Sequence, residues 1–475
     1  MYRLKSAQSA SKDVWKGKTI YQILTDRFDK FPTTTEICDD LTNYCGGTFE
    51  GIRNRLDYVV DLGVDAIWIS PVVSNTEGGY HGYWAKNLFT INENFGTEAD
   101  LANLIESAHS RGLMVMVDVV TNHMGQGMDD IPDLYPFNDT SYYHDCNGCP
   151  PSCWVEDFDD MDQVLHCQLF GLPDLAHEND YVGQELIKWI TDLMNKWHFD
   201  GMRLDTVPYV EKDYWAEFSE AAGVFSIGEI STNDISRISD YVNAGIMDST
   251  LQYPLYYSAI GCFANMAPMT DLSKALNDAR EAMGMYEVQY LGTFTENHDQ
   301  PRFLALRYDI QADKNMIMFS IATEGIPCLY YGVEQGYHGG LAFEENREPL
   351  WTSGFPTQDS YMGLYNFIQK ILQMRRLSKF YLHSNTEIYA DDQLYIFSRG
   401  DVLFALTNVG ENGVTISRSI SGYGVPYTKG TTVCNIFYPD DDCMTIEEDY
   451  TIDIVLVQGE CKAFIPRNVT RSIAV

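Results

Sequence analysis

Carboxylate side chains stand at the ends of several short apolar runs in this chain of 475 residues. One run ends in DVVTNH (118–123), and another contains Arg203 two residues before Asp205. Two later runs end at Glu229 and in FTENHD (294–299). A single Asp after a strand is most often a helix N-cap, but four such ends are better explained by one site where carboxylates meet.

Carboxylates that converge in a cleft suit glycoside hydrolysis. One acid protonates the leaving oxygen, and a second carboxylate attacks the anomeric carbon or activates water. Arg203 and Asp205 are two residues apart, so in a strand both side chains point to the same face. The guanidinium is always charged and keeps a neighbouring carboxylate ionised, which favours Asp205 as the nucleophile. Glu229 has no cation beside it in sequence, and we expect it to be the acid, with a pKa raised by burial or by negative neighbours.

The segments around these residues predict the fold. Apolar runs alternate with amphipathic segments, of which Gln184–Trp197 has the clearest helical period. Because parallel strands need long crossovers, this alternation over residues 1–381 predicts an α/β fold, a (β/α)8 TIM barrel with its site at the carboxyl ends of the strands. The predicted strands are Thr19–Leu24, Ala66–Ser70, Leu113–Val120, Gly201–Asp205, Val224–Ile230, Leu291–Thr295 and Pro327–Tyr331.

Two regions depart from this alternation. Residues 123–174 are rich in Asp, Pro, Gly and Tyr, and a stretch of that length predicts a small domain inserted after the third strand. From residue 382 the pattern changes to short alternating strands, which predict a C-terminal antiparallel β-sandwich domain over 382–475. The barrel then comprises 1–122 and 175–381. The predicted C-terminal strands are Glu387–Tyr389, Gln393–Ser398, Val402–Thr407, Gly413–Ile420 and Thr451–Val457.

The composition narrows the class of partner. Lys and Arg number 32 against 68 Asp and Glu, a formal net charge of −36. Such a surface repels phosphate backbones and anionic lipid heads, which argues against nucleic acid and membrane surfaces as partners. No run approaches the roughly 18 apolar residues of a membrane span. Aromatic residues make up 13% of the chain, and sugar rings are neutral and stack on aromatic faces.

Eleven cysteines indicate the redox compartment. Most fall in loop-rich stretches, which predicts disulfides and an oxidising environment, whereas Cys262 and Cys328 lie among apolar residues and are expected to be buried thiols. Zinc is the alternative for Cys146 and Cys149, with His144 and His166 nearby. The clustered cysteines are Cys38 and Cys45; Cys146, Cys149, Cys153 and Cys167; and Cys434, Cys443 and Cys461.

The expected location follows from these cysteines. The first 18 residues are polar and contain no apolar core of a signal peptide, so the chain is either cytosolic or has lost such a peptide. The cysteines favour the second interpretation, and the sequons at Asn138 and Asn468 are consistent with a glycoprotein. We expect a secreted, extracellular monomer, and association with a cell wall stays open.

The segments DVVTNH, GMRLDTV (201–207), IGEI (227–230) and FTENHD resemble, in order and spacing, the four signature regions of the α-amylase family, glycoside hydrolase family 13. The likeness is greatest to secreted fungal α-amylases and extends to YQILTDRF, YCGGTF, GYHGYW, LPDL and NREPLW. The resemblance implies retaining endo-hydrolysis of α-1,4-glucosidic bonds in starch, glycogen and maltooligosaccharides. It implies Asp205 as nucleophile, Glu229 as general acid/base and Asp299 as the third carboxylate, which stabilises the transition state.

The resemblance also implies the binding residues. A structural Ca2+ is expected between the barrel and the inserted domain, where hard oxygen ligands are required. Its implied ligands are Asn122, Asp174, the backbone carbonyl of Tyr209 and a fourth group at Leu165, for which Asp160 or Asp162 are alternatives. The implied sugar-binding residues are His81, Tyr83, Trp84, His123, Arg203, His298 and Arg347.

The sequence departs from the fungal pattern at three places. Leu165 replaces an acidic calcium ligand, and Pro208 and Tyr209 replace a Lys-His pair that contacts the sugar after the scissile bond. An Asp three residues before Arg347 is replaced by Glu344, or lost with Phe343 in its place. The altered acceptor side favours, as an alternative, a 4-α-glucanotransferase acting on α-glucan. An inactive glucan-binding protein is the alternative of another class, but all three carboxylates are retained.

Overall fold

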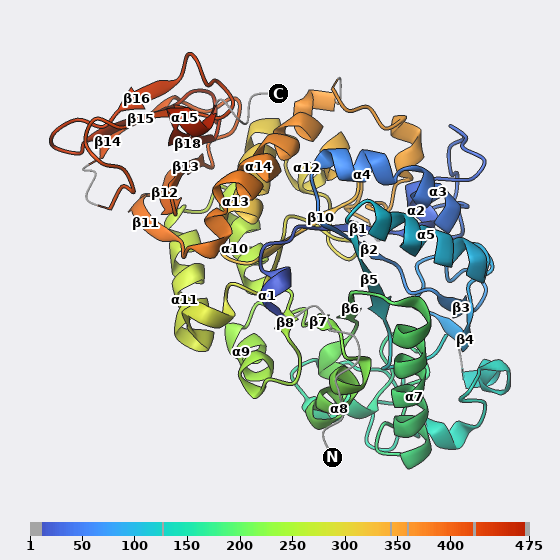
Figure 1. The fold of residues 1–475 in the computed structure, drawn as a ribbon. Coiled ribbons are helices and arrows are strands. Elements are labelled where there is room, and N and C mark those ends of the chain that lie inside the picture. The colour runs from blue at the N-terminus through green and yellow to red at the C-terminus, as the bar shows by residue number, and fades with distance from the viewer. Residues whose placement is uncertain (1–11, 126–127, 343, 359–360, 421–423, 471–475) are drawn as a thin grey trace, which may run out of the picture.

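The computed structural model describes residues 12–125, 128–342, 344–358, 361–420 and 424–470. Its centre is a sheet of eight parallel strands in the order β8-β7-β6-β5-β2-β1-β10-β9 (Figure 1). Leu251, next after β8, forms a parallel bridge with Gly292 of β9 and closes the sheet into a barrel. The strands are β1 (Ile20–Ile23), β2 (Ala66–Ile69), β5 (Met114–Val119), β6 (Gly201–Leu204), β7 (Phe225–Gly228), β8 (Ser249–Thr250), β9 (Gly292–Phe294) and β10 (Ile326–Tyr330).

Helices pack around the barrel and confirm the predicted (β/α)8 fold. The longest amphipathic helix, α7, begins at Asp180, four residues before the predicted start, because the Asn179 side chain caps it by accepting from the Tyr181 N–H. The helices are α1 (Lys12–Trp15), α2 (Thr25–Phe28), α3 (Phe49–Asn54), α4 (Leu56–Leu62), α5 (Glu98–Ser110), α6 (Met161–His166), α7 (Asp180–Trp197), α8 (Lys212–Ala222), α9 (Ile235–Ala244), α10 (Tyr253–Phe263), α11 (Thr270–Glu287), α12 (Phe303–Leu306), α13 (Ile310–Ala322), α14 (Leu364–Ser378) and α15 (Arg467–Thr470).

All seven predicted barrel strands are present, each within a residue or two of its predicted ends. The eighth strand, β8, was not predicted because it contains only Ser249 and Thr250, two polar residues that do not form an apolar run. A hairpin between β2 and α5 was also missed. It consists of β3 (Val73–Asn75) and β4 (Ala85–Ile91), and its connection carries the GYHGYW segment.

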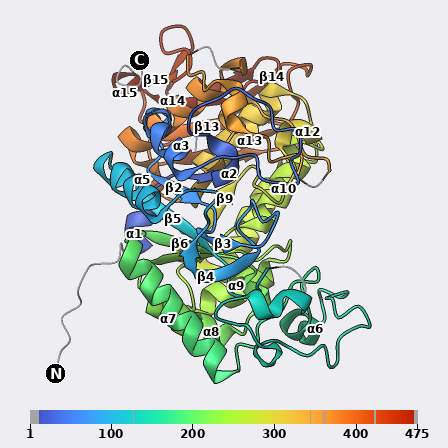
Figure 2. The same cartoon turned by 90° about the vertical axis from the view of Figure 1, so that its right-hand side faces the viewer.

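The segment between β5 and α7 contains two 3-10 helices, η1 (Met128–Asp133) and η2 (Thr140–Tyr142), and the short helix α6. A disulfide joins Cys149 to Cys167 at the end of α6. Figure 2 shows this segment beside α9, and Arg237 of α9 donates to the Phe158 carbonyl at 3.2 Å. Because Cys149 is in the disulfide, the zinc alternative that required it is wrong.

The C-terminal region is antiparallel, as predicted. A six-stranded sheet in the order β11-β12-β13-β18-β15-β16 packs against the pair β14-β17 around a second apolar core. The disulfide Cys434–Cys443 joins β15 and β16, two strands that the sequence reading missed together with β18. The strands are β11 (Thr386–Ala390), β12 (Leu394–Arg399), β13 (Val402–Thr407), β14 (Ile416–Ile420), β15 (Thr432–Asn435), β16 (Cys443–Thr445), β17 (Ile452–Leu456) and β18 (Lys462–Pro466).

The remaining cysteines divide into a third disulfide and free thiols. Cys38 pairs with Cys45, while Cys262 and Cys328 are buried free thiols, as predicted. Cys146, Cys153 and Cys461 are also free, so the prediction of disulfides is wrong for these three clustered cysteines. Within the ranges that the structure describes, the helices are all too short or too polar to cross a membrane.

A buried arginine joins the barrel to the C-terminal region. Arg399, at the end of β12, is 1% exposed and donates to the carbonyls of Ala322 and His383, both at 2.9 Å, and to those of Thr323 and Tyr381. Its guanidinium therefore satisfies backbone acceptors from both sides of the junction.

Arg399→Ala is expected to lower the free energy of unfolding by about 3 kcal/mol or more, because it leaves several buried carbonyls without donors. Arg376→Ala, on the exposed side of α14, is the matched control and should cost less than about 1 kcal/mol. Urea denaturation followed by fluorescence measures both. Equal losses for the two variants would contradict this role of Arg399.

Candidate active site

The carboxyl ends of the barrel strands open into a cleft of about 1200 Å³. Asp205 directly follows β6, Glu229 directly follows β7, and Asp299 lies in the loop after β9. The structure thus brings the three predicted carboxylates to one cleft. Of the predicted sugar-binding residues, all except Arg203 line it: His81, Tyr83, Trp84, His123, His298 and Arg347.

Arg203 lies beneath the cleft floor and holds two of these carboxylates. Its side chain is 1% exposed. Its Nη1 lies 2.5 Å from Oδ1 of Asp205, and its Nη2 lies 3.0 Å from Oε2 of Glu229. Asp205 and Glu229 therefore face the two arms of one guanidinium, from neighbouring strands.

A fourth carboxylate, Asp118 near the end of β5, completes this group. Its Oδ1 accepts from Nη1 of Arg203 at 2.9 Å, and its Oδ2 accepts from Trp68 Nε1 at 3.0 Å and Tyr83 Oη at 2.9 Å. Burial raises the pKa of Asp118 to about 6, and Arg203 opposes that increase. One cation thus stands among three carboxylates, so ionising all three would leave uncompensated negative charge in a buried site.

Glu229 is the carboxylate that this imbalance affects most. Burial raises its pKa to about 8, Arg203 opposes the increase, and the charges of Asp205 and Asp299 add to it. Thr206, whose backbone adopts the left-handed region (φ 49°), points its N–H at Oε2 of Glu229 at 3.2 Å. A pKa raised above neutrality favours the protonated form of Glu229 at pH 7, the form that a general acid requires.

Asp299 is more open to solvent than Asp205 and Glu229. Its side chain is 34% exposed, with Oδ2 at 3.1 Å from Nε2 of His298 and Oδ1 at 3.5 Å from Nη2 of Arg347. Its backbone N–H donates to Oδ1 of Asn297 at 2.9 Å, which fixes the turn that presents the carboxylate. A half-exposed carboxylate can accept hydrogen bonds from a bound sugar.

Aromatic and imidazole rings form one wall of the cleft. The rings of Tyr83 and His298 are nearly parallel with centroids 5.3 Å apart, those of Tyr83 and His81 lie 5.5 Å apart, and Trp84 meets His81 edge-on. His123 Nε2 lies 3.1 Å from the Tyr83 carbonyl.

The imidazoles of this wall are neutral at pH 7. Burial lowers the pKa of His298 and of His81 well below the usual value, and nearby arginines add to the effect. Burial also lowers the pKa of His123. Gln22 donates to Nδ1 of His298 at 2.7 Å, so the single proton is on Nε2, which lies 2.7 Å from Oη of Tyr83 and 3.1 Å from Oδ2 of Asp299.

The other end of the cleft is apolar. It is lined by side chains of the inserted segment and by Tyr209 of η3 (Val207–Tyr209), and Lys212 and Arg237 also line the cleft. Phe170 is 74% exposed and Phe158 is 46% exposed, so aromatic faces are open to a ligand there. The apolar lining residues of the segment are Phe158, Met161, Val164, Leu169, Phe170 and Leu172.

The implied calcium ligands lie where β5 ends and the inserted segment returns. Asn122 and Asp174 are buried, and within the described part of the chain neither Oδ1 has a hydrogen-bond partner. His144 holds the other carboxylate oxygen of Asp174, with Nδ1 to Oδ2 at 2.6 Å. These two oxygens have no hydrogen-bond partner among the residues that the structure describes and lie where the family resemblance implies the calcium ion, so they fit a hard cation.

The fourth calcium ligand is less well supported. Leu165 is in α6, and Asp160, one of its alternatives, caps that helix by accepting from the Asp162 N–H at 3.1 Å. Among the described residues, groups of three or more His, Cys, Asp or Glu side chains suited to a metal are absent. A calcium site here would therefore depend on the single carboxylate of Asp174, on the amide of Asn122 and on backbone carbonyls.

The sequence analysis placed Asp118 among the strand-end carboxylates but did not predict its pairing with Arg203, and it did not predict Trp68, Gln22 or Tyr80 as part of the site. Asp118, Trp68 and Gln22 hold the predicted residues from below, and Tyr80 holds Arg347 by accepting from its Nη1 at 2.9 Å. Asp118 stood within DVVTNH, but its pairing with Arg203 depends on strand register, in which their Cα atoms are partners. Glu344 lines the cleft, whereas Phe343 lies outside the described residues.

Comparisons with known proteins agree with this geometry. The sequence profile of the α-amylase catalytic domain matches residues 22–376. Alpha-amylase 2 of Schwanniomyces occidentalis is 33% identical over 97% of this chain and 92% of its own length, and an α-amylase of Saccharomycopsis fibuligera is 32% identical over 97% and 93%. The structure of an α-amylase from Malbranchea cinnamomea has a TM-score of 0.90 at 33% identity, covering 98% of this chain and 99% of that one. The chain therefore belongs to the α-amylase family of glycoside hydrolases.

Proposed function

We propose that this α-amylase cleaves internal α-1,4-glucosidic bonds with retention of anomeric configuration, with Asp205 as nucleophile and Glu229 as general acid/base. The observation that carries the proposal is the Arg203 guanidinium between the two carboxylates, at 2.5 Å from Asp205 and 3.0 Å from Glu229. A retaining mechanism needs two carboxyl groups about 5 Å apart, one ionised and one protonated. The contact of both carboxyl groups with one guanidinium supports a short distance between Asp205 and Glu229. The raised pKa of Glu229 supports its role as the protonated acid and that of Asp205 as the ionised nucleophile.

The reaction proceeds in two displacements. An oxygen of Asp205 attacks the anomeric carbon while Glu229 transfers its proton to the glycosidic oxygen, and the reducing-end fragment leaves. Glu229, now ionised, takes a proton from water, whose oxygen attacks the same carbon and breaks the bond to Asp205. Two inversions give net retention and return both residues to their starting states.

The remaining side chains bind and orient the sugars. Tyr83 offers its ring to the sugar at the cleavage position, and His298 and His123 hydrogen-bond its hydroxyls as neutral imidazoles. Asp299 accepts from hydroxyls of the same sugar, and its charge helps to keep Glu229 protonated. Arg347 reaches the next sugar on the non-reducing side, and His81 and Trp84 support Tyr83.

A calcium ion is proposed to join the barrel to the inserted segment, since α-amylases generally bind calcium. Asn122 and Asp174 would hold it through their unpartnered oxygens, together with the carbonyls of Tyr209 and Leu165. The ion would supply a fixed positive charge that ties the end of β5 to this segment, which forms one wall of the cleft.

The domain limits and location are proposals of the same kind. We divide the chain into a barrel (1–122 and 175–381), an inserted domain (123–174) and a C-terminal domain (382–475). The three disulfides support a secreted protein, because disulfides persist in oxidising compartments. The exposed side chains of Asn138 and Asn468 are available for glycosylation, and we propose a monomer.

A 4-α-glucanotransferase activity is the second candidate. The acceptor end of the cleft is walled by Tyr209, Phe158 and Phe170, which would favour a stacked sugar ring over water. Transfer to a sugar hydroxyl instead of water would use the same covalent intermediate.

The pH profile tests the role of Glu229. A general acid must carry its proton, so kcat/KM should fall as the pH rises through about 8. Asp299→Asn removes a negative charge that raises the pKa of Glu229. The residual kcat/KM of this variant should therefore begin to fall at a lower pH than that of the wild type. Asp240→Asn, which removes a charge from the outer cleft, is the control and should leave the midpoint in place. An unchanged midpoint in Asp299→Asn would argue against this coupling.

Calcium removal tests the proposed ion. A chelator should lower the melting temperature of the wild type, and Asp174→Asn should abolish that response because it removes a charged ligand. Scanning calorimetry with and without added calcium provides the readout. The melting temperature of Asp160→Asn should still fall when the chelator is added. If it does not, Asp160 is a calcium ligand in place of Leu165. A wild type indifferent to the chelator would refute the site.

Products from maltopentaose decide between hydrolysis and transfer. The wild type should yield mainly oligosaccharides shorter than the substrate, resolved by chromatography, and Asp205→Asn should lose at least about 10³-fold in kcat because the covalent step is absent. A majority of products longer than maltopentaose would establish the transferase, and Tyr209→Lys should then reduce transfer. The proposed mechanism would be wrong if the wild type and Asp205→Asn had equal kcat values, or if the wild type did not turn over maltopentaose.

A further inference from the structure

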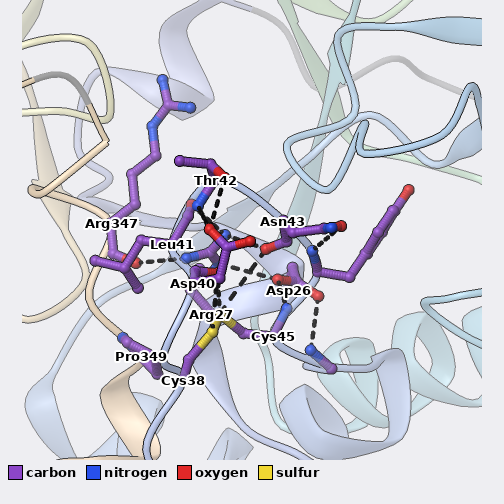
Figure 3. Close-up of a disulfide and its surroundings, with 12 residues drawn as sticks. Asp26, Arg27, Cys38, Asp40, Leu41, Thr42, Asn43, Cys45, Arg347 and Pro349 are labelled. Carbon is purple, nitrogen blue, oxygen red and sulfur yellow. Dashed lines mark hydrogen bonds and ion pairs between the residues drawn. A yellow bond between two sulfur atoms is a disulfide. The ribbon is translucent and has the colours of Figure 1, made fainter.

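An exposed loop beside the cleft is closed by a disulfide. Residues 36–45 form neither helix nor strand, and most of their side chains are exposed or half-buried. Cys38 and Cys45 are bonded across this loop (Figure 3). A disulfide restricts the conformations that such a loop can adopt and so fixes the direction of its carbonyl groups.

Two of these carbonyls bind a buried arginine. Arg27 of α2 is fully buried, and its Nη2 donates to the carbonyls of Leu41 at 2.9 Å and Asn43 at 2.8 Å, both inside the disulfide loop. Its Nε donates to Asp26 Oδ2 at 2.9 Å. The planar guanidinium is thus held by acceptors on two sides.

Asp26 ties the same arginine to the end of the loop. Its Oδ2 accepts from the Cys45 N–H at 2.7 Å, and its Oδ1 accepts from the Gly46 N–H at 2.9 Å. The loop, Asp26 and Arg27 therefore form one hydrogen-bonded unit next to the first barrel strand.

The free end of this unit reaches the sugar-binding residue Arg347. Nη1 of Arg27 donates to the carbonyl of Arg347 at 3.2 Å, and the guanidinium lies 3.9 Å from the centre of the Tyr80 ring. Tyr80 in turn accepts from Nη1 of Arg347 at 2.9 Å. Figure 3 shows the guanidinium of Arg347 extending away from Arg27, and it lines the cleft near Asp299.

A second contact joins the loop to the same segment. Trp351, four residues after Arg347, donates from Nε1 to the carbonyl of Glu36 at 2.8 Å. Glu344, three residues before Arg347, lines the cleft and accepts from the Arg347 N–H at 3.0 Å through its carbonyl. The loop thus braces the segment 344–351 at two points.

We propose that Arg27 is a positioning residue for glucan binding, which sets the place of Arg347 in the cleft, and that the Cys38–Cys45 disulfide fixes the acceptors that orient Arg27. The inference rests on the proposed role of Arg347 in binding the sugar on the non-reducing side. Arg27 itself is buried and touches no substrate.

The expected effect is on binding more than on turnover. Arg347 would hold the sugar next to the cleaved one in both the ground state and the transition state, so misplacing it weakens both equally. Such a loss raises KM and leaves kcat nearly unchanged. Lysine retains the charge of Arg27 but lacks the planar fork, and cannot satisfy Leu41, Asn43, Asp26 and Arg347 together.

The test compares two variants, each with a matched control. Steady-state kinetics on maltoheptaose and the melting temperature are measured for all of them. Arg27→Lys is matched by Arg399→Lys, since both arginines are buried and donate to backbone carbonyls. Cys38→Ser/Cys45→Ser is matched by Cys434→Ser/Cys443→Ser, which opens the disulfide of the C-terminal sheet. Arg347→Gln reports separately on the sugar-binding role.

Arg27→Lys and Cys38→Ser/Cys45→Ser should each raise KM at least about fivefold with kcat within about twofold of wild type, and the two controls should leave KM unchanged whatever their melting temperatures. Arg347→Gln should raise KM at least as much. If Arg347→Gln raises KM while Arg27→Lys only lowers the melting temperature, the positioning role is wrong. If Arg347→Gln leaves KM unchanged, the proposed binding role of Arg347 fails instead.

Discussion

One guanidinium among three carboxylates is the interaction on which the site depends. Arg203 is buried and contacts Asp118, Asp205 and Glu229 at 2.9, 2.5 and 3.0 Å. A single positive charge cannot balance three negative charges in a buried place, so one carboxyl retains its proton. Glu229, with a pKa raised to about 8, is that group. In the proposed mechanism, the different roles of Asp205 and Glu229 would therefore arise from a charge imbalance that the barrel imposes.

The barrel imposes it through strand register. Asp118 and Arg203 are Cα partners on β5 and β6, and Asp205 and Glu229 directly follow neighbouring strands. The surroundings then hold each group in place, because Trp68 and Tyr83 donate to Asp118, and Tyr83 stacks on the neutral His298. A second buried arginine, Arg27, connects an exposed, disulfide-closed loop to Arg347. In both places a buried arginine fixes the geometry of groups that face the substrate.

Local sequence patterns predicted much of this architecture. They did not predict contacts between residues that are distant in sequence. The spacing of Arg203 and Asp205 and the apolar runs predicted the barrel and two of the three carboxylates, while the role of Asp299 required the family resemblance. The two polar residues of β8 carry no apolar signal, so that strand was missed. Asp118 joins Arg203 only through register, and Arg27 reaches Arg347 across 320 residues because β1 and β10 are neighbours in the barrel. The calcium ligands were placed by resemblance alone, and the bare oxygens of Asn122 and Asp174 give that placement its physical support.

The protonation states of Asp205 and Glu229 are the most direct test of the account. Neutron diffraction from deuterium-exchanged crystals at about pH 6 locates the deuterons on both carboxyl groups. We expect a deuteron on Glu229 and none on Asp205, with both oxygens of Asp205 accepting hydrogen bonds. A deuteron on Asp205, or two bare carboxylates, would contradict it.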